Sequence, residues 1–106
     1  MVNRNKVLSL LGFSQKAGKA ISGAEGLRWH ISNKKAHVII MAEDIEEKDR
    51  KAIARLCQEK RVPCVEFLDQ DSLGKAIGRS PKKAVAVTDK GMAAAILKLM
   101  DRGEIK

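Results

Sequence analysis

Hydrophobic residues along this chain recur in two ways, with helical spacing in some segments and as short continuous runs in others. Apolar positions three and four residues apart predict helices over residues 5–17, 22–33, 44–60, 69–77 and 90–100. The pattern therefore predicts five helices, and the segments between them are candidate strands.

Four candidate strands alternate with these helices, at residues 19–22, 37–42, 64–67 and 84–88. The second is a continuous apolar run, which is typical of a central strand covered on both faces. Helices that alternate with strands predict an α/β fold, a three-layer α/β/α sandwich around one mostly parallel sheet. Because no linker or repeat interrupts the pattern, we expect one domain over residues 1–106.

Particular residues predict the helix ends and the buried helix faces. Gly18 suits a left-handed residue after the first helix. Ser22 with Glu25 forms an S-x-x-E capping box before the second helix, and Asp44 with Glu47 is a capping signal for the third. The expected buried stripes of the second and third helices are Ala24, Leu27 and Ile31, and Ala52, Ile53, Leu56 and Cys57.

The composition is typical of a globular protein and predicts no disulfide, metal site or membrane segment. The 106 residues are 44% hydrophobic, and no apolar run approaches the roughly 20 residues that a membrane span needs. No apolar region leads to a cleavage site, so we expect a cytoplasmic protein with no membrane partner. Cys57 and Cys64 form a lone pair with few histidines, which predicts two small hydrophobic side chains, not a metal site.

The charge is strongly basic and unevenly distributed. There are 21 Lys and Arg against 13 Asp and Glu, a net charge of +8. Residues 1–40 hold seven basic residues and one acidic, 41–71 hold six and nine, and 72–106 hold eight and three. This excess is compatible with a merely solvated surface, but it favours a polyanionic partner. Aromatic residues are only 3%, which argues against RNA readers built on aromatic platforms.

No enzyme motif is present. The chain has neither a P-loop nor a dinucleotide-binding glycine pattern, and neither His30 nor His37 lies near a serine or cysteine in a known motif. Five carboxylates cluster in one segment, but basic residues interleave with them. Acidic residues are favoured at the start of a helix, and this explains most of the cluster. We therefore expect no catalytic residues, no cofactor, no metal and no small-molecule substrate. The clustered carboxylates are Glu43, Asp44, Glu46, Glu47 and Asp49.

Two segments are suited to nucleic acid. Residues 22–28 begin a helix and include small side chains, which let a phosphate or a base edge approach the backbone amides. Lys19 and Arg28 flank this helix start with positive charge. The capping box alone is the alternative explanation. Residues 73–83 hold four cations and no acid, and Gly78 and Pro81 predict a tight loop there. Simple exposure of a basic loop is the alternative for this segment.

Together these segments resemble a known family. Over about residues 5–100 the chain is similar to the kink-turn-binding ribosomal proteins of the seven-Ae and thirty-e type, and among them to the small bacterial YlxQ-like subgroup. The order and spacing of several stretches carry the resemblance. These stretches are residues 17–19, 22–25, 38–45, 62–63 and 73–78.

The resemblance implies a fold and a partner. It implies a four-stranded mixed sheet in the order 1-4-2-3, with the fourth strand antiparallel. That order would bring the end of the first strand beside the start of the fourth, so both basic segments would share one surface. The implied partner is structured, kink-turn-like RNA, with ribosomal RNA and the ribosome as the expected context. The alternative is a protein-interaction module on the same fold.

The family's recognition helix opens with a Gly-x-Asn-Glu motif whose Asn and Glu face tandem G·A pairs. Residues 22–25 align with this motif, and Arg28 aligns with a family lysine. Glu46 aligns with an acidic position near an extruded nucleotide, and residues 79–81 with a loop that closes on unstacked bases. The basic segments and the resemblance together give the full set of expected RNA-binding residues, some from one ground and some from the other. These residues are Lys19, Ser22, Gly23, Ala24, Glu25, Arg28, Glu46, Lys75, Arg79, Ser80 and Pro81.

One position departs from the family. Ala24 replaces the Asn and removes a side chain that both donates and accepts hydrogen bonds. A hydrogen bond lost at such an interface corresponds to roughly 1–3 kcal/mol, about ten- to a hundredfold in affinity. We therefore expect weaker kink-turn recognition, or a different RNA.

Overall fold

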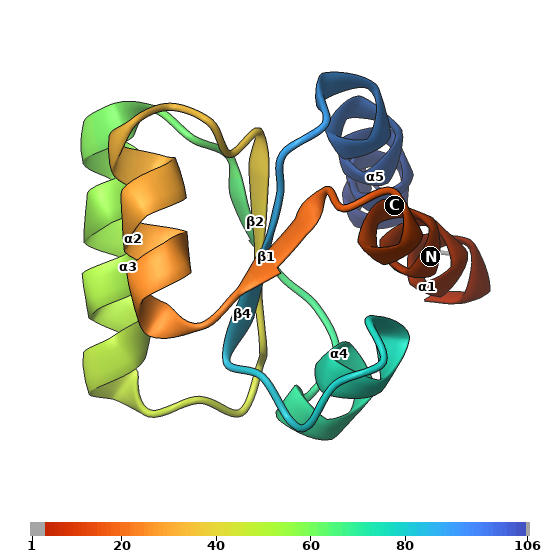
Figure 1. The fold of residues 1–106 in the computed structure, drawn as a ribbon, viewed down its shortest axis with the longest axis horizontal. Helices are drawn as coiled ribbons and strands as arrows, with labels where there is room; N and C mark the ends of the chain where they lie inside the picture. Colours follow the sequence, from red (N-terminus) through yellow and green to blue (C-terminus); the bar gives the residue numbers. More distant parts are fainter. Residues whose placement is uncertain (1–3, 106) are drawn as a thin grey trace.

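Four short strands form one sheet, and helices cover both of its faces (Figure 1). The computed structural model describes residues 4–105, with side-chain surroundings to residue 100; residues 1–3 and 106 of the expected domain lie outside the described part. In chain order the elements are α1 (Arg4–Lys16), β1 (Ala20–Ser22), α2 (Ala24–Ser32), β2 (Val38–Met41), α3 (Glu47–Lys60), β3 (Cys64–Glu66), α4 (Gln70–Ala76), β4 (Ala84–Val87) and α5 (Lys90–Ile105).

The strand order is β1-β4-β2-β3, as the family resemblance implied. β4 runs antiparallel to both neighbours, and only β2 and β3 are parallel, so the expectation of a mostly parallel sheet is wrong. The reason is that α4 does not carry the chain back across the sheet. β4 therefore starts beside the end of β2, where Met41 pairs with Ala84, and beside the end of β1, where Ser22 pairs with Val85.

The side chains of β4 alternate between the two halves of the core. Val85 and Val87 pack in the cluster that includes α1 and α5 residues, whereas Ala84 and Ala86 pack with residues of α2 and α3. Figure 1 shows the same division, with α2 and α3 on one face and α1, α4 and α5 on the other. Because the α2–α3 face of β4 carries only methyl groups, space remains beneath these two helices.

Two predicted helix caps are wrong. The N-cap of α2 is Gly23, with φ 95° and ψ 142° and no side-chain hydrogen bond, so Ser22 and Glu25 do not form a capping box. Glycine adopts this backbone conformation readily, whereas other residues are strained there. The N-cap of α3 is Glu46. Asp44 instead accepts a hydrogen bond from the Gln70 N–H at 3.0 Å, which ties this loop to the start of α4.

The buried stripes are confirmed in part. Leu27, Ile31 and Cys57 are buried, but Ala24 and Ala52 are exposed. The left-handed conformation expected at Gly18 is confirmed by its φ of 72°. None of the helices described between residues 4 and 105 has the length and apolar content required to cross a membrane.

The loop between α4 and β4 packs directly against a glycine of α4. A Cβ added to Gly74 would lie 2.1 Å from the Ser80 carbonyl oxygen and 2.9 Å from Pro81 Cα. The Arg79 N–H also donates to the Gly74 carbonyl at 2.8 Å. The backbone of α4 at Gly74 therefore contacts the backbone of the loop at Ser80 and Pro81. Because Gly74 has no side chain, the loop can lie this close to the helix.

We predict that Gly74→Ala destabilises the protein even though alanine is the better helix former. The methyl group would have to displace backbone atoms of Ser80 and Pro81, and such overpacking typically reduces the free energy of unfolding by about 1–3 kcal/mol. Chemical denaturation would measure the loss. Gly12→Ala in α1 is the matched control, because its new Cβ would make only an ordinary 3.6 Å contact. Equal stability of the two variants would contradict the prediction.

Candidate nucleic-acid interface

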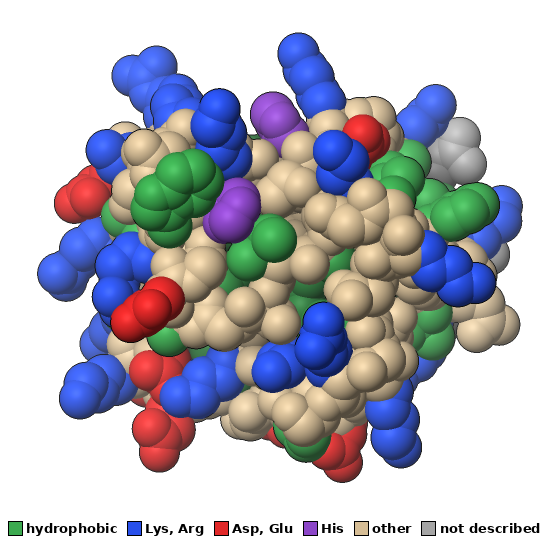
Figure 2. Space-filling model, viewed as in Figure 1, with side chains coloured by type: hydrophobic (Ala, Val, Ile, Leu, Met, Phe, Trp, Pro, Cys, Tyr) green, Lys and Arg blue, Asp and Glu red, His purple; other side chains and the backbone are tan. Residues whose placement is uncertain are grey.

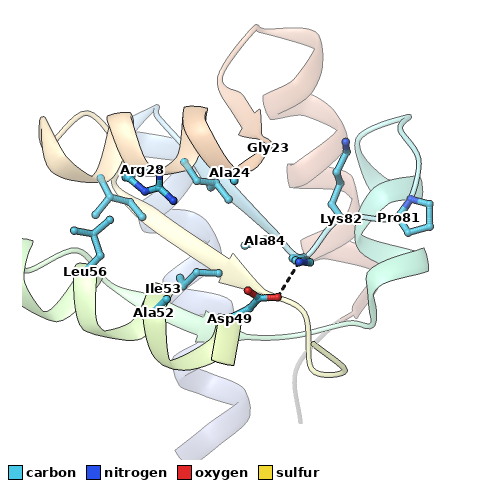
Figure 3. A pocket seen from close by; sticks show the side chains of 13 residues that line it. Gly23, Ala24, Arg28, Asp49, Ala52, Ile53, Leu56, Pro81, Lys82 and Ala84 are labelled. Carbon is cyan, nitrogen blue, oxygen red and sulfur yellow. Dashed lines mark ion pairs between the residues drawn. The ribbon is translucent and has the colours of Figure 1, made fainter. Parts of the chain in front are cut away.

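A pocket of about 380 Å³ opens between α2, α3 and the start of β4 (Figure 3). Ala24 and Arg28 of α2 lie across it from Ile53 and Leu56 of α3. Ala84 lines it from the start of β4. The full lining is Gly23, Ala24, Leu27, Arg28, Ile31, Asp49, Ala52, Ile53, Leu56, Pro81, Lys82, Lys83 and Ala84.

Local structure explains why a pocket forms here. Gly23 turns the chain sharply from β1 into α2, so the first turn of α2 stands at the pocket mouth. The first helical hydrogen bond runs from the Leu27 N–H to the Gly23 carbonyl at 2.9 Å. The N–H groups before it belong to the free first turn that every α-helix has. Small side chains at Ala24, Ala52 and Ala84 leave the opening unfilled.

The pocket rim is basic, with one acidic group inside it. Lys83 Nζ lies 2.8 Å from Asp49 Oδ2, and the two side chains are 59% and 30% exposed. Its hydrogen bond to the Asp49 carboxylate raises the pKa of the Lys83 ammonium above its ordinary value. Arg28 and Lys82 add two further cations. Lys and Arg side chains also gather below α2 and in front of β4 in the space-filling view (Figure 2).

The structure brings several of the expected RNA-binding residues together. Gly23, Ala24, Arg28 and Pro81 all line the pocket, although they come from segments about fifty residues apart. Ser22 directly precedes Gly23 at the end of β1. The antiparallel pairing of β1 with β4 is what joins the two segments.

Other expected residues lie outside the pocket. Glu25 is exposed on α2, and Arg79 and Ser80 are exposed on the loop before Pro81; Lys75 is exposed on α4, and Glu46 at the start of α3. Lys19 precedes β1, and its carbonyl accepts from the Thr88 N–H at 2.8 Å, beyond the far end of β4. Its backbone lies three positions before Ser22, roughly 10 Å along an extended strand, so this backbone does not flank the first turn of α2.

The pocket also contains residues that the sequence analysis did not select. Asp49 was interpreted only as an acidic residue at a helix start, and its pairing with Lys83 spans 34 positions of sequence. Lys82 and Lys83 were part of a recognised basic segment, but nothing in the sequence indicated which cations would reach the pocket. The apolar wall from α3 was expected to be buried core, and the exposure of Ala52 shows that part of it remains open.

The two cysteines contact each other in the core and are not grouped with other potential metal ligands among the described residues. Within the described part of the chain, no group of three or more His, Cys, Asp or Glu side chains could hold a metal ion. The thiol of Cys57 is hydrogen bonded to Cys64, and this contact together with burial raises the pKa of Cys57 above its ordinary value. Cys57 is therefore a neutral thiol at physiological pH, which fits its position in the core.

Comparison with known proteins identifies the family. The model of the Ribosomal protein L7Ae/L30e/S12e/Gadd45 family matches residues 5–97. This chain belongs to that family. It is 33% identical over 91 residues to the RNA-binding protein YlxQ of Enterococcus faecium, covering 86% of this chain and 87% of the relative. It is 32% identical over 92 residues to the RNA-binding protein YlxQ of Bacillus subtilis (strain 168), covering 87% and 92%.

Solved structures show the same fold. A Bacillus halodurans protein described as of unknown function superposes with a TM-score of 0.87 at 26% identity, over 91% of this chain and 97% of its own. The Giardia lamblia 15.5kD RNA binding protein superposes with a TM-score of 0.76 at 20% identity, over 96% and 88%. The family's α/β/α architecture and mixed sheet are therefore present in this member.

We predict that Asp49→Asn lowers the pKa of Lys83, because the carboxylate is the main group that stabilises the charged ammonium. An NMR titration of the Lys83 side chain would measure the shift. Glu46→Gln is the matched control, since Glu46 is the weakest of the groups that act on Lys83 and its removal should change this pKa less. An unchanged pKa in Asp49→Asn would show that the ion pair does not form in solution.

Proposed function

We propose that this chain is a non-enzymatic RNA-binding domain that recognises structured, kink-turn-like RNA at the pocket between α2, α3 and β4. The observation that carries the proposal is the convergence of the first turn of α2 with the basic start of β4 on one cavity. The relatives named as RNA-binding proteins support the choice of RNA over other polyanions. Ribosomal RNA and a cytoplasmic, ribosome-associated role are part of the same proposal.

The pocket offers the two kinds of contact that RNA recognition needs. Arg28, Lys82 and Lys83 supply charge for phosphates at the rim. The free N–H groups of the first turn of α2 can donate to phosphate oxygens or base edges. Glu25 is exposed beside them and can accept a hydrogen bond from a guanine, as its aligned position does in the family. Positioning contacts and base contacts would thus lie around the first turn of α2 and the residues that precede β4.

The loop and the acidic residue at α3 complete the proposed surface. Arg79, Ser80 and Pro81 form the loop that we propose closes on unstacked bases, held in place by Gly74. Glu46, exposed at the start of α3, is proposed to lie near an extruded nucleotide. Lys75 adds charge on the adjoining helix α4, and the exposed Lys19, near the other end of β1, is proposed to meet RNA beyond the pocket.

Binding to a panel of RNA duplexes tests the proposed function. The panel pairs each kink-turn duplex with a duplex of equal length in which the tandem G·A pairs are replaced by Watson–Crick pairs. Fluorescence anisotropy with purified protein should show tighter binding to the kink-turn RNAs. Equal binding to both sets would reject kink-turn recognition, and binding to neither would favour a protein partner for the pocket.

We predict that RNA affinity falls steeply with salt and that Lys82→Ala makes this dependence shallower. Each phosphate contact releases about one counterion, so losing one contact should reduce the slope of log affinity against log salt by roughly 1. Titrations at several salt concentrations would measure the slope. Lys98→Ala is the matched control, an exposed lysine on α5 in the opposite helical layer, and its slope should equal that of the unaltered protein. A slope unchanged by Lys82→Ala would remove Lys82 from the interface.

We predict that Ala24→Asn strengthens binding to RNAs with tandem G·A pairs by about ten- to a hundredfold, since an amide at this exposed position can both donate and accept. The substitution should lower stability by only a few tenths of a kcal/mol. The exposed Ala94 of α5 provides the control Ala94→Asn, which should leave affinity unchanged. A gain on all RNAs alike, or no gain, would show that α2 does not face G·A pairs.

A further inference from the structure

Trp29 is the single tryptophan of the chain, and its side chain is 54% exposed on α2. The buried face of this helix consists of Leu27 and Ile31, so Trp29 takes no part in the core. Tryptophan is the side chain most enriched at binding hot spots. The scarcity of aromatic residues argues against a platform of several rings, but it does not bear on a single exposed ring.

The surroundings of Trp29 hold its ring in place. The ring lies edge to face with that of His30, with centroids 4.9 Å apart and planes at 73°. His30 Nδ1 lies 2.7 Å from the Gly26 carbonyl oxygen, to which the protonated nitrogen donates. The Asn33 side-chain amide donates to the Trp29 carbonyl at 2.8 Å and steadies the last turn of α2. The contact with His30 restricts the ring on one side, which lowers the side-chain entropy lost on binding.

The charge around Trp29 suits an anionic partner. Arg28 is its neighbour in the helix, and Lys34 and Lys35 are exposed just beyond the end of α2. Figure 2 shows a large hydrophobic side chain beside a histidine over α2, with Lys and Arg side chains nearby. Glu25 is the one acidic residue among the first forty. This setting favours a nucleotide over an acidic or neutral protein surface, because exposed cations that can meet phosphate precede and follow Trp29 in the chain.

Trp29 also lies in register with the proposed RNA site. Glu25 and Trp29 are four residues apart, so they share one helix face and are separated by about 6 Å along the axis. Successive nucleotides of a stacked strand are about 3.4 Å apart. A strand that meets Glu25 therefore reaches Trp29 within about two nucleotides. We propose that Trp29 is a stacking platform for an unpaired nucleotide that flanks the RNA bound at the pocket, an inference that rests on the function proposed above.

The test compares one kink-turn RNA in three forms, trimmed flush or carrying a four-nucleotide single-stranded extension at its 5′ or its 3′ end. The unaltered protein should bind one extended form about five- to a hundredfold more tightly than the trimmed form, the usual range for a base stacked on an aromatic ring. Trp29→Ala should abolish this difference, and Trp29→Phe should retain most of it. Phe13→Ala is the matched control, because Phe13 is 65% exposed on α1 in the other helical layer. The difference should survive in Phe13→Ala.

Intrinsic fluorescence gives a second readout, since Trp29 is the only tryptophan. The favoured extended RNA should quench it more strongly than the trimmed RNA at saturation. Equal affinity of the unaltered protein for all three forms would overturn the platform while leaving the pocket function intact. An extension preference that persists in Trp29→Ala would also overturn it. Failure of every form to bind better than its Watson–Crick control would instead reject the proposed function itself.

Discussion

The antiparallel insertion of β4 between β1 and β2 is the constraint on which the candidate site depends. The register sets Ser22 opposite Val85 and Met41 opposite Ala84, so three chain segments meet at one end of the sheet. At this end the chain turns from β1 into α2 at Gly23 and enters β4 from a basic loop. A parallel β4 would carry its basic start to the opposite end of the sheet, and the two basic segments would lie apart.

Side-chain size on β4 then determines which face of the sheet is fully packed and which face has a pocket. Val85 and Val87 fill the face toward α1 and α5, and their branched side chains are completely buried. Ala84 and Ala86 present only methyl groups toward α2 and α3. A two-residue period thus assigns the larger residues to one half of the core and the smaller ones to the other. The pocket over Ala84 follows from this alternation together with the small residues that α2 and α3 place at its mouth.

Hydrophobic patterning predicted eight of the nine elements to within three residues, because buried runs and helical stripes are local properties of the chain, whereas α5 ends five residues later than expected. The strand order required the family resemblance, since periodicity carries no information on pairing. The cap predictions at Ser22 and Asp44 were wrong for a physical reason: motif spacing does not reveal that Gly23 adopts a positive φ, or that Asp44 has a partner in Gln70. The pairing of Asp49 with Lys83 was equally invisible, because it joins distant segments whose approach depends on the whole sheet.

The ion pair inside the pocket bears on what kind of RNA contact the site would favour. The Lys83 side chain is 59% exposed, so a phosphate can reach its ammonium, but the Asp49 Oδ2 atom is buried and would then lack its ion-pair partner. In the absence of RNA, Asp49 holds the Lys83 ammonium at the pocket rim, which reduces the conformational entropy that Lys83 would lose on binding. The released carboxylate would repel a second phosphate but accept a hydrogen bond from a base amino group. Under the proposed function, a basic rim around a single acceptor would hold phosphates at the edge and admit a base, which bent or unpaired RNA offers and a regular duplex does not.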